Sequence, residues 1–196
     1  MKRFFLLLTV LTVICVFGAK TVSAQGCAFP TGSLGINLGL GLGNSDFVGY
    51  HYNGHYYDGH FIVPTFNAAV DYAFLGNIIN SNGSISGGGY FGIGGGRDKW
   101  EGNKNINNRF RLGTRGALHY TWVRNLDTYA GVGLGFRQDR YKRKDANGTT
   151  HDLGSPSDFD CFGFAGIHYI MGNFAFYSEL QTTNFSVFQI GISFVL

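Results

Sequence analysis

The feature that most constrains the fold is the stretch at residues 186–196, which reads S-V-F-Q-I-G-I-S-F-V-L. Its large apolar residues fall on alternate positions: Phe188, Ile190, Ile192, Phe194 and Leu196. Successive side chains of a β-strand point to opposite faces, so the stretch predicts a strand with one continuous apolar face. The other face carries only small or polar residues: Gln189, Gly191 and Ser193. The rest of the fold must provide apolar surroundings for this strand.

The composition favours an all-β membrane chain over a helical one. Aromatic residues make up 16% of the 196 residues, glycine occurs 31 times, and charged residues make up only 14%. Soluble domains carry about 25% charged residues. The mean hydropathy of +0.02 is far below that of a helical membrane protein. It suits a membrane barrel, because only alternate residues of a barrel strand meet lipid.

The N-terminus carries a secretory signal peptide pattern. Lys2 and Arg3 precede an apolar run at residues 4–18, and Val22 and Ala24 occupy the small-residue positions of a cleavage site. The alternative is a membrane anchor, but the run is shorter than the ~20 apolar residues that a spanning helix needs. We expect residues 1–24 to be a signal peptide and residues 25–196 to form one barrel domain.

Removal of the signal peptide changes the charge and the number of cysteines. It removes three of the 15 Lys and Arg residues and leaves 12, which equals the 12 Asp and Glu residues. A neutral mature chain gives no reason to expect nucleic acid binding. Cys27 and Cys161 remain, and we expect them to lie at opposite ends of the barrel and to form no disulfide. Lipidation of Cys27 within A-Q-G-C is a minor alternative.

Eight segments show the alternation of strands. They are residues 34–43, 61–74, 84–96, 109–123, 127–138, 159–171, 174–181 and 186–196. Pro64 lies inside the second segment, where it would cost a ladder hydrogen bond. In the sixth segment, Phe162 and Phe164 oppose the phase of Ile167 and Tyr169, so we expect a β-bulge there.

The predicted connections alternate in length. Long connections follow the first, third and fifth segments, including a charged loop at 97–108 and the longest loop at 139–158. The turns after the fourth and sixth segments are short, and the turn after the second is of medium length. Short turns on the periplasmic side and longer loops outside are the layout of bacterial outer-membrane barrels.

These segments resemble the small outer-membrane β-barrel domain family of OmpX or OmpA transmembrane-domain type. The resemblance spans residues 34–196 and is carried by R-G-A-L-H-Y at 115–120, Y-A-G-V-G-L-G-F at 129–136, Y-S-E-L at 177–180 and the closing strand. Gln189, Gly191, Phe194 and Leu196 match the family's C-terminal insertion signal, although the family more often ends in Phe or Trp.

The resemblance implies an eight-stranded antiparallel up-and-down transmembrane β-barrel in the outer membrane of a Gram-negative bacterium. It further implies insertion by the barrel-assembly machinery, contact with outer-membrane lipid and lipopolysaccharide, and a monomer.

Several ionisable residues fall on the predicted inner face of the strands. They are Asp71, Arg111, Arg115, His119, Arg137 and Glu179. An eight-stranded barrel is just wide enough for its own side chains, and an unpaired buried charge is very costly. We therefore predict a structural charge network in which Arg115 pairs with Asp71 or Glu179. A gated conduction path is the alternative.

Two loop clusters suggest contacts outside the barrel. Arg140, Lys142, Arg143 and Lys144 could contact lipopolysaccharide phosphates, or they could lie on a solvated loop with nearby aspartates. The histidines at 51, 55 and 60 lie near Asp58, but their spacing matches no closed metal site. We expect no metal and no cofactor.

The favoured function is that of a non-enzymatic outer-membrane barrel whose loops contact the envelope or a surface partner. One alternative is a lipid A-modifying enzyme, but His119 and His168 lack a serine two residues on. The other alternative is a soluble exported barrel of lipocalin type. Its strands would leave a large apolar band without cover in water.

Overall fold

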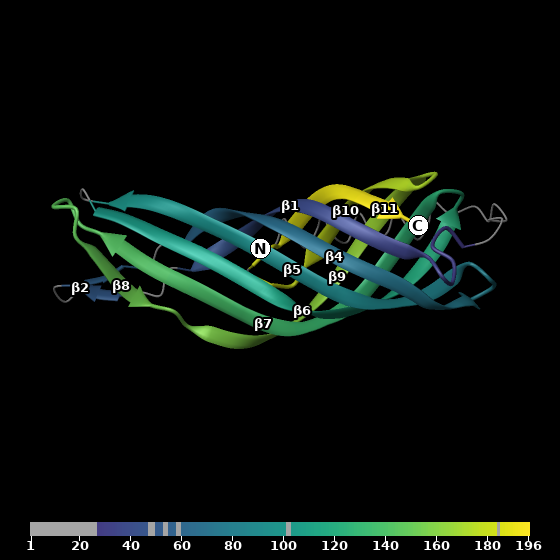
Figure 1. Ribbon diagram of the computed structural model, residues 1–196, viewed down its shortest axis with the longest axis horizontal. Coiled ribbons are helices and arrows are strands. Elements are labelled where there is room, and N and C mark those ends of the chain that lie inside the picture. Colours follow the sequence, from purple (N-terminus) through teal and green to yellow (C-terminus); the bar gives the residue numbers. More distant parts are fainter. Residues whose placement is uncertain (1–26, 47–49, 53–54, 58–59, 101–102, 184) are drawn as a thin grey trace.

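The computed structural model in Figure 1 is an elongated cylinder of β-strands. It describes residues 27–46, 50–52, 55–57, 60–100, 103–183 and 185–196, and the side chains of 44–62 and 98–100 are not among those described. The predicted signal peptide lies outside the described residues. Within the described part of the chain, no helix combines the length and apolar character needed to span a membrane.

Eleven strands are described, and eight of them form a closed ring. Their bounds are β1 (Leu34–Asp46), β2 (Tyr50–Tyr52), β3 (His55–Tyr57), β4 (His60–Ile78), β5 (Gly83–Trp100), β6 (Asn103–Val123), β7 (Leu126–Lys144), β8 (Thr150–Gly154), β9 (Ser157–Met171), β10 (Phe174–Gln181) and β11 (Phe188–Val195).

The ring runs β1-β4-β5-β6-β7-β9-β10-β11, and every neighbouring pair is antiparallel. β11 pairs with β1 from Gly35↔Val195 to Leu42↔Phe188, and this pairing closes the ring. β2 and β3 form a separate hairpin, and β8 adds to the end of β7. The prediction of an eight-stranded antiparallel up-and-down barrel is confirmed.

The two ends of the barrel differ, as Figure 1 shows. β2 and β8 lie at one end, which we call the loop end, and the C-terminus lies toward the other, which we call the turn end. Two-residue connections at the turn end join β6 to β7 and β9 to β10. Asn125 (φ 69°) and Gly172 (φ 65°) adopt the left-handed backbone conformation that tight hairpin turns require. These turns set the register of the side chains near them.

Within the band that lipid would cover, most large apolar side chains point outward and the charged side chains point inward. β7 illustrates this: Val132, Leu134 and Phe136 are exposed on the outer face, whereas Asp127 and Tyr129 are buried in the lumen. The outward apolar run of β7 ends where Gln138 and Arg140 begin. It therefore spans about the 9–11 residues that a strand needs to cross a bilayer. A closed ring with this distribution has no free edge and needs lipid around it.

Two predicted loops are largely strand. β5 continues to Trp100 and β6 starts at Asn103, so the prediction of a charged loop at 97–108 is wrong. This segment is a hairpin that extends beyond the apolar band. Likewise, β7 continues to Lys144, and β8 occupies part of the loop expected at 139–158. Strand extensions outside lipid have no apolar face. Their sequence therefore lacks the strict alternation of apolar and polar residues by which a strand is predicted.

The bulge expected in the sixth segment is absent from the described pairing of β7 with β9, which runs without a register shift. Phe162 and Phe164 are buried in the lumen, while Ile167 and Tyr169 face outward. The alternation is therefore regular, and the two phenylalanines are large apolar residues on the inner face. Pro64 is accommodated because the pairing of β4 with β5 begins only at Thr65↔Gly94.

Candidate functional site

The lumen is closed at the turn end by the segment that precedes β1. Phe29 is buried there, and its ring stacks on His119 with centroids 4.7 Å apart. The Ala28 N–H donates to Thr121 Oγ1 at 2.7 Å, and the Ser84 hydroxyl donates to the Phe29 carbonyl at 2.6 Å. These bonds hold the segment inside the mouth of the barrel as a plug.

The loop end of the lumen is closed by the connection between β10 and β11. Phe185 in this connection is fully buried. The guanidinium carbons of Arg109 and Arg111 lie 5.5 and 5.8 Å from its ring centroid. A Cβ added to Gly92 would meet the Phe185 ring at 2.6 Å, so the ring rests directly on the barrel wall. The connection therefore acts as a second plug.

The middle of the lumen contains an ion-pair network centred on Arg115. Its Nε lies 2.9 Å from Asp71 Oδ1, and its Nη1 lies 3.1 Å from Glu179 Oε2, so it pairs with both predicted partners. The Tyr129 hydroxyl donates to Glu179 Oε2 at 2.9 Å, and the Gln189 amide donates to Glu179 Oε1 at 2.6 Å. These contacts supply the hydrogen-bond partners that buried polar side chains need inside a closed lumen.

Aromatic rings line the lumen beside Arg111 and Arg115. The sequence analysis did not place these rings in the lumen. The Arg111 guanidinium carbon lies 3.6 Å from the Phe162 ring centroid, and the Arg115 guanidinium carbon lies 4.4 Å from the Phe164 centroid. Both distances are within the range of cation–π attraction. Arg111 also pairs with Asp160 at 2.9 Å. The signal in the sequence was the even-numbered phase of β9, which places both phenylalanines inside.

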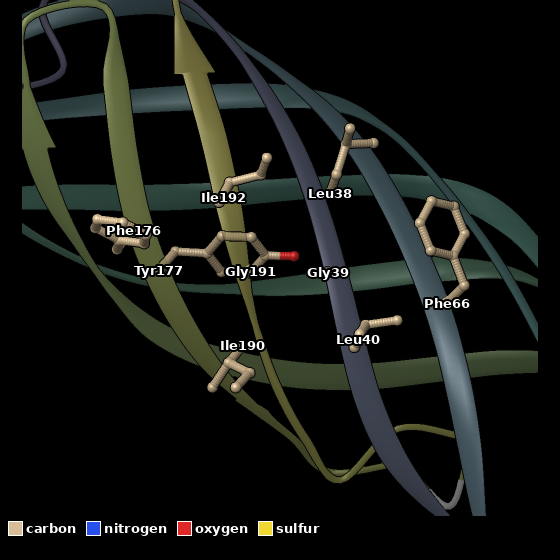
Figure 2. A pocket seen from close by; sticks show the side chains of 9 residues that line it. All are labelled: Leu38, Gly39, Leu40, Phe66, Phe176, Tyr177, Ile190, Gly191 and Ile192. Carbon is tan, nitrogen blue, oxygen red and sulfur yellow. The ribbon is translucent and has the colours of Figure 1, made fainter.

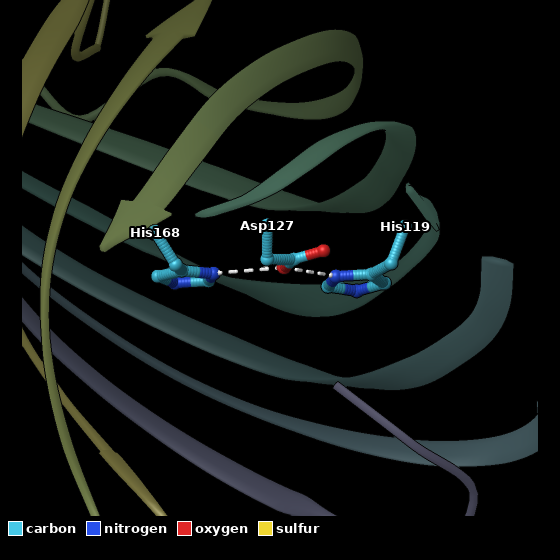
Figure 3. A group of neighbouring side chains, drawn as sticks. All are labelled: His119, Asp127 and His168. Atoms are coloured by element: carbon cyan, nitrogen blue, oxygen red, sulfur yellow. Dashed lines mark hydrogen bonds and ion pairs between the residues drawn. The ribbon is translucent and has the colours of Figure 1, made fainter. Parts of the chain in front are cut away.

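A His–Asp–His cluster lies next to the turn-end plug (Figure 3). His119 Nδ1 lies 2.7 Å from Asp127 Oδ2, and His168 Nδ1 lies 3.3 Å from the same oxygen. All three side chains are buried. Asp127 did not appear among the predicted lumen residues, and His168 was weighed only as a catalytic residue. The cluster could have been found from the two tight turns, the one before β7 and the one after β9, because they set Asp127 directly opposite His168 in the ladder.

Arg137 lies apart from this inner network. Its side chain is partly exposed at the loop end and lies 3.5 Å from Asp158 and 3.7 Å from Asp139. The other five predicted lumen residues, Asp71, Arg111, Arg115, His119 and Glu179, are all buried.

The four predicted basic contact residues separate onto two faces of β7. Lys142 and Lys144 share the outward phase of Arg140, which pairs with Asp152 at 3.2 Å. Arg143 has the inward phase, and its Nε lies 3.1 Å from Asp145. The histidines of the first loop lie outside the described side chains.

The closing seam of the barrel depends on a pair of glycines (Figure 2). Gly39 in β1 lies opposite Gly191 in β11, and the Tyr177 ring lies against both from the lumen side. A Cβ at Gly39 or Gly191 would overlap the Tyr177 ring or a backbone carbonyl. On the outer face, the same glycines leave a shallow apolar groove of about 600 Å³.

The residues of the predicted insertion signal occupy both faces of this last strand. Gln189 points into the lumen, while Phe194 and Leu196 are exposed on the outer face. Cys27 and Cys161 are both free thiols, and Cys27 Sγ lies 3.6 Å from Ser84 Oγ near the turn-end plug.

The fold and the lumen define the class of protein. A ring without free edges, an outward apolar band and a lumen filled with paired charges are the features of a small transmembrane β-barrel. This is the architecture of the small outer-membrane barrels of OmpX and OmpA transmembrane-domain type.

Solved structures with a similar chain trace include two of Ail, the attachment invasion locus protein of Yersinia pestis, one of them in complex with the heparin analogue sucrose octasulfate. They share 14% identity, cover 84% of this chain and 95% of Ail, and have TM-scores of 0.48 for the complex and 0.49. Neisserial surface protein A (NspA) shares 10% identity, with coverage of 85% and 97% and a TM-score of 0.49. No protein-family model and no curated protein matches the chain. The fold assignment rests on the strand pairing itself.

Proposed function

We propose that the chain is a non-enzymatic integral protein of the outer membrane of a Gram-negative bacterium, exported by a signal peptide at residues 1–24. The barrel-assembly machinery inserts it as a monomer, with the turn end in the periplasm and the loop end outside the cell. The observation that carries this proposal is the apolar outer band around a lumen plugged at both ends. Lipid covers the apolar band of such a barrel, and the strand extensions at its loop end face the outside of the cell.

The test of this proposal is the behaviour of the mature chain with and without detergent. It should partition with outer-membrane fractions, resist extraction by urea and migrate faster on a gel before boiling than after. A mature chain that stays monodisperse in plain buffer would contradict the proposal and favour a soluble lipocalin-like barrel instead.

The two plugs argue against a conduction path. Phe29 closes one end and Phe185 the other, and the ion pairs of Arg115 fill the middle. In planar bilayers, the wild type and the Phe29→Ala/Phe185→Ala double variant should both lack steady ion conductance, because the charge network still blocks the lumen. Steady conductance of the wild type would refute a closed lumen.

A hydrolytic function has one specific observation in its favour. Ser86 Oγ lies 2.9 Å from His119 Nε2, and His119 Nδ1 lies 2.7 Å from Asp127, which is the hydrogen-bond order of a Ser–His–Asp triad. This serine comes from β5, so a search for a serine two residues after the histidine could not find it. Ser86 is, however, 1% exposed and lies beneath the plug at the turn end, where no lipid headgroup reaches it.

We therefore assign this serine a structural role. Lipid A from cells expressing the wild type and the Ser86→Ala variant should give the same mass spectrum. A modification that appears with the wild type and disappears with the variant would establish the enzyme instead.

The outer face of the loop-end extension carries a basic stripe. Lys104 lies opposite Lys144 on neighbouring strands, and Arg140 and Lys142 share their outward phase. The stripe begins just beyond Phe136, where the apolar band ends. Each cationic side chain near an anionic membrane surface contributes about 1 kcal/mol of attraction. We propose that this stripe contacts lipopolysaccharide phosphates.

Variants that remove charge from the stripe test this contact. Lys142→Gln/Lys144→Gln should weaken retention of lipopolysaccharide by about tenfold or more at low salt, with a smaller difference at high salt. Arg124→Gln is the matched control, because Arg124 is exposed at the opposite end of the barrel. Sucrose octasulfate is a convenient soluble polyanion for the same comparison. Equal retention by all three proteins would refute the contact.

A further inference from the structure

The hydrogen-bond partners of His168 determine where its protons lie. Its Nε2 faces Asn37 Oδ1 at 3.3 Å, and the Asn37 amide is oriented by donation from Nδ2 to Asp71 Oδ2 at 2.8 Å. An amide oxygen only accepts, so His168 Nε2 must carry a hydrogen. His168 Nδ1 faces a carboxylate oxygen of Asp127, so it either carries a second proton or presents its lone pair to a cation shared with that oxygen.

The charges in the middle of the lumen create a demand for positive charge. Among the described side chains of the inner lumen, Asp71 and Glu179 share one guanidinium, that of Arg115, and the carboxylate of Asp127 faces only the two histidines. Three negative charges against one positive charge leave two negative charges without compensation. Arg111 does not change this balance, because it pairs with its own carboxylate at Asp160. Uncompensated buried charge is very costly.

We propose that His119, Asp127 and His168 bind a divalent transition-metal cation, with zinc as the best match. Imidazole nitrogens and a carboxylate oxygen are ligands that zinc prefers. One such ion between two neutral histidines supplies the two missing positive charges. In the metal-bound form, His119 Nε2 would donate to Ser86 Oγ, 2.9 Å away, as His168 Nε2 donates to Asn37 Oδ1, so that both Nδ1 atoms present their lone pairs to the metal.

The three ligand atoms of the cluster lie within 4.8 Å of one another, so the two histidines would have to close up around such an ion. Zinc–ligand bonds of 2.0–2.1 Å in tetrahedral geometry place ligand atoms about 3.3 Å apart. His168 Nδ1 is already 3.3 Å from Asp127 Oδ2, whereas His119 Nδ1, at 2.7 Å, would have to move back slightly. Asp127 Oδ1 is buried and has no hydrogen-bond partner among the described residues, so the carboxylate retains an acceptor that a cation can use.

The plug covers this site. Phe29 stacks on His119, and the segment that carries it is held by the bonds from Ala28 and Ser84. This segment shields the cluster from the turn end of the lumen. The ion ties β6, β7 and β9 together close to their turns.

The competing explanation is that both histidines are doubly protonated, which supplies the same two positive charges. Calorimetric titration of the folded protein with zinc in detergent micelles separates the two, with buffers of different ionisation enthalpy reporting proton release. We expect one zinc ion per chain, with any protons displaced from the ligands appearing in the buffer dependence of the binding enthalpy. Cobalt(II) should produce the visible absorption bands of a low-coordinate nitrogen and oxygen site.

Variants then locate the ion. His168→Gln and Asp127→Asn should each weaken zinc binding by more than about a hundredfold, which exceeds the effect of losing an outer partner of a metal ligand. His151→Gln is the control, since that histidine is exposed on β8 and should leave zinc binding unchanged. Heat-modifiable gel migration confirms that each variant folds.

Two results would overturn the proposal. The first is a wild-type barrel that binds no zinc at 100-fold molar excess while ¹⁵N spectra show both nitrogens of His119 and His168 protonated. The second is zinc binding that survives His168→Gln unchanged, which would place the ion elsewhere. The wild-type measurement decides the question even if a variant does not fold.

Discussion

Replacement of Arg115 by methionine is the most direct perturbation of the lumen. Methionine matches the length of the apolar stem of arginine but removes the guanidinium, which lies 2.9 Å from Asp71 and 3.1 Å from Glu179. Both carboxylates are buried, with side-chain exposures of 3% and 0%. The variant also loses the stacking of the guanidinium on Phe164 at 4.4 Å. Two carboxylates are thereby left in the lumen without their cation.

The structure allows a magnitude for this loss. Removing one partner of a buried ion pair costs about 3–5 kcal/mol, and two stranded carboxylates place Arg115→Met at the upper end of that range. Since about 1.4 kcal/mol corresponds to a factor of ten, the ratio of folded to unfolded protein should fall by about three orders of magnitude. Urea unfolding of the refolded barrel in lipid vesicles, followed by tryptophan fluorescence, measures this free energy.

Two controls make this prediction refutable. The triple variant Arg115→Met/Asp71→Asn/Glu179→Gln has no stranded charge and should recover most of the lost free energy of unfolding. Arg140→Met breaks the exposed pair with Asp152 and should leave the free energy of unfolding nearly unchanged, because water screens this pair. The reasoning fails if Arg115→Met costs no more than Arg140→Met, or if the triple variant is as unstable as the single one.

Three further predictions concern the barrel wall, the turn-end plug and the ion pair between β7 and β8. An added methyl at Gly88 would overlap the backbone of the neighbouring strand, whereas at Gly89 it meets only an ordinary contact. In urea unfolding, Gly88→Ala should therefore cost about 1–3 kcal/mol and Gly89→Ala about 0.5 kcal/mol or less; equal costs would contradict this packing. Phe29→Ala should lower the free energy of unfolding by about 3 kcal/mol because the ring is fully buried, and an unchanged value would mean that the plug does not close the barrel. The Gly154 N–H and the guanidinium of Arg140 hold the pKa of Asp152 below its ordinary value, so its stabilising contribution is lost as pH falls through that lowered pKa. In NMR titration, Arg140→Gln should move this pKa upward, and no movement would exclude the pair in solution.

The strands that cross the apolar band could be predicted from sequence because their physical environment imposes a period of two. Lipid outside and a narrow lumen inside select large apolar and small or polar residues at alternate positions, as at residues 34–43 and in the closing strand. The strand extensions around Trp100 and Lys144 could not be predicted, because water on the outer face imposes no such pattern. The inward direction of Phe162 and Phe164 was read as a β-bulge, because large apolar residues were expected only on the outer face. An aromatic ring can face the lumen when it packs against an arginine there.

The sequence alone determined the closed antiparallel barrel, the direction of most side chains and the presence of buried charge, because these follow from local alternation and from the cost of exposing polar groups to lipid. Only the tertiary structure decided which charges meet. Closure of β1 on β11 and the shear of the ring bring Asn37 beside His168 from the opposite end of the chain. It also decided that Phe29 and Phe185 fill the two ends of the lumen, since both come from connecting segments without periodicity. Such contacts depend on the registers of all eight strands together, which no single segment encodes.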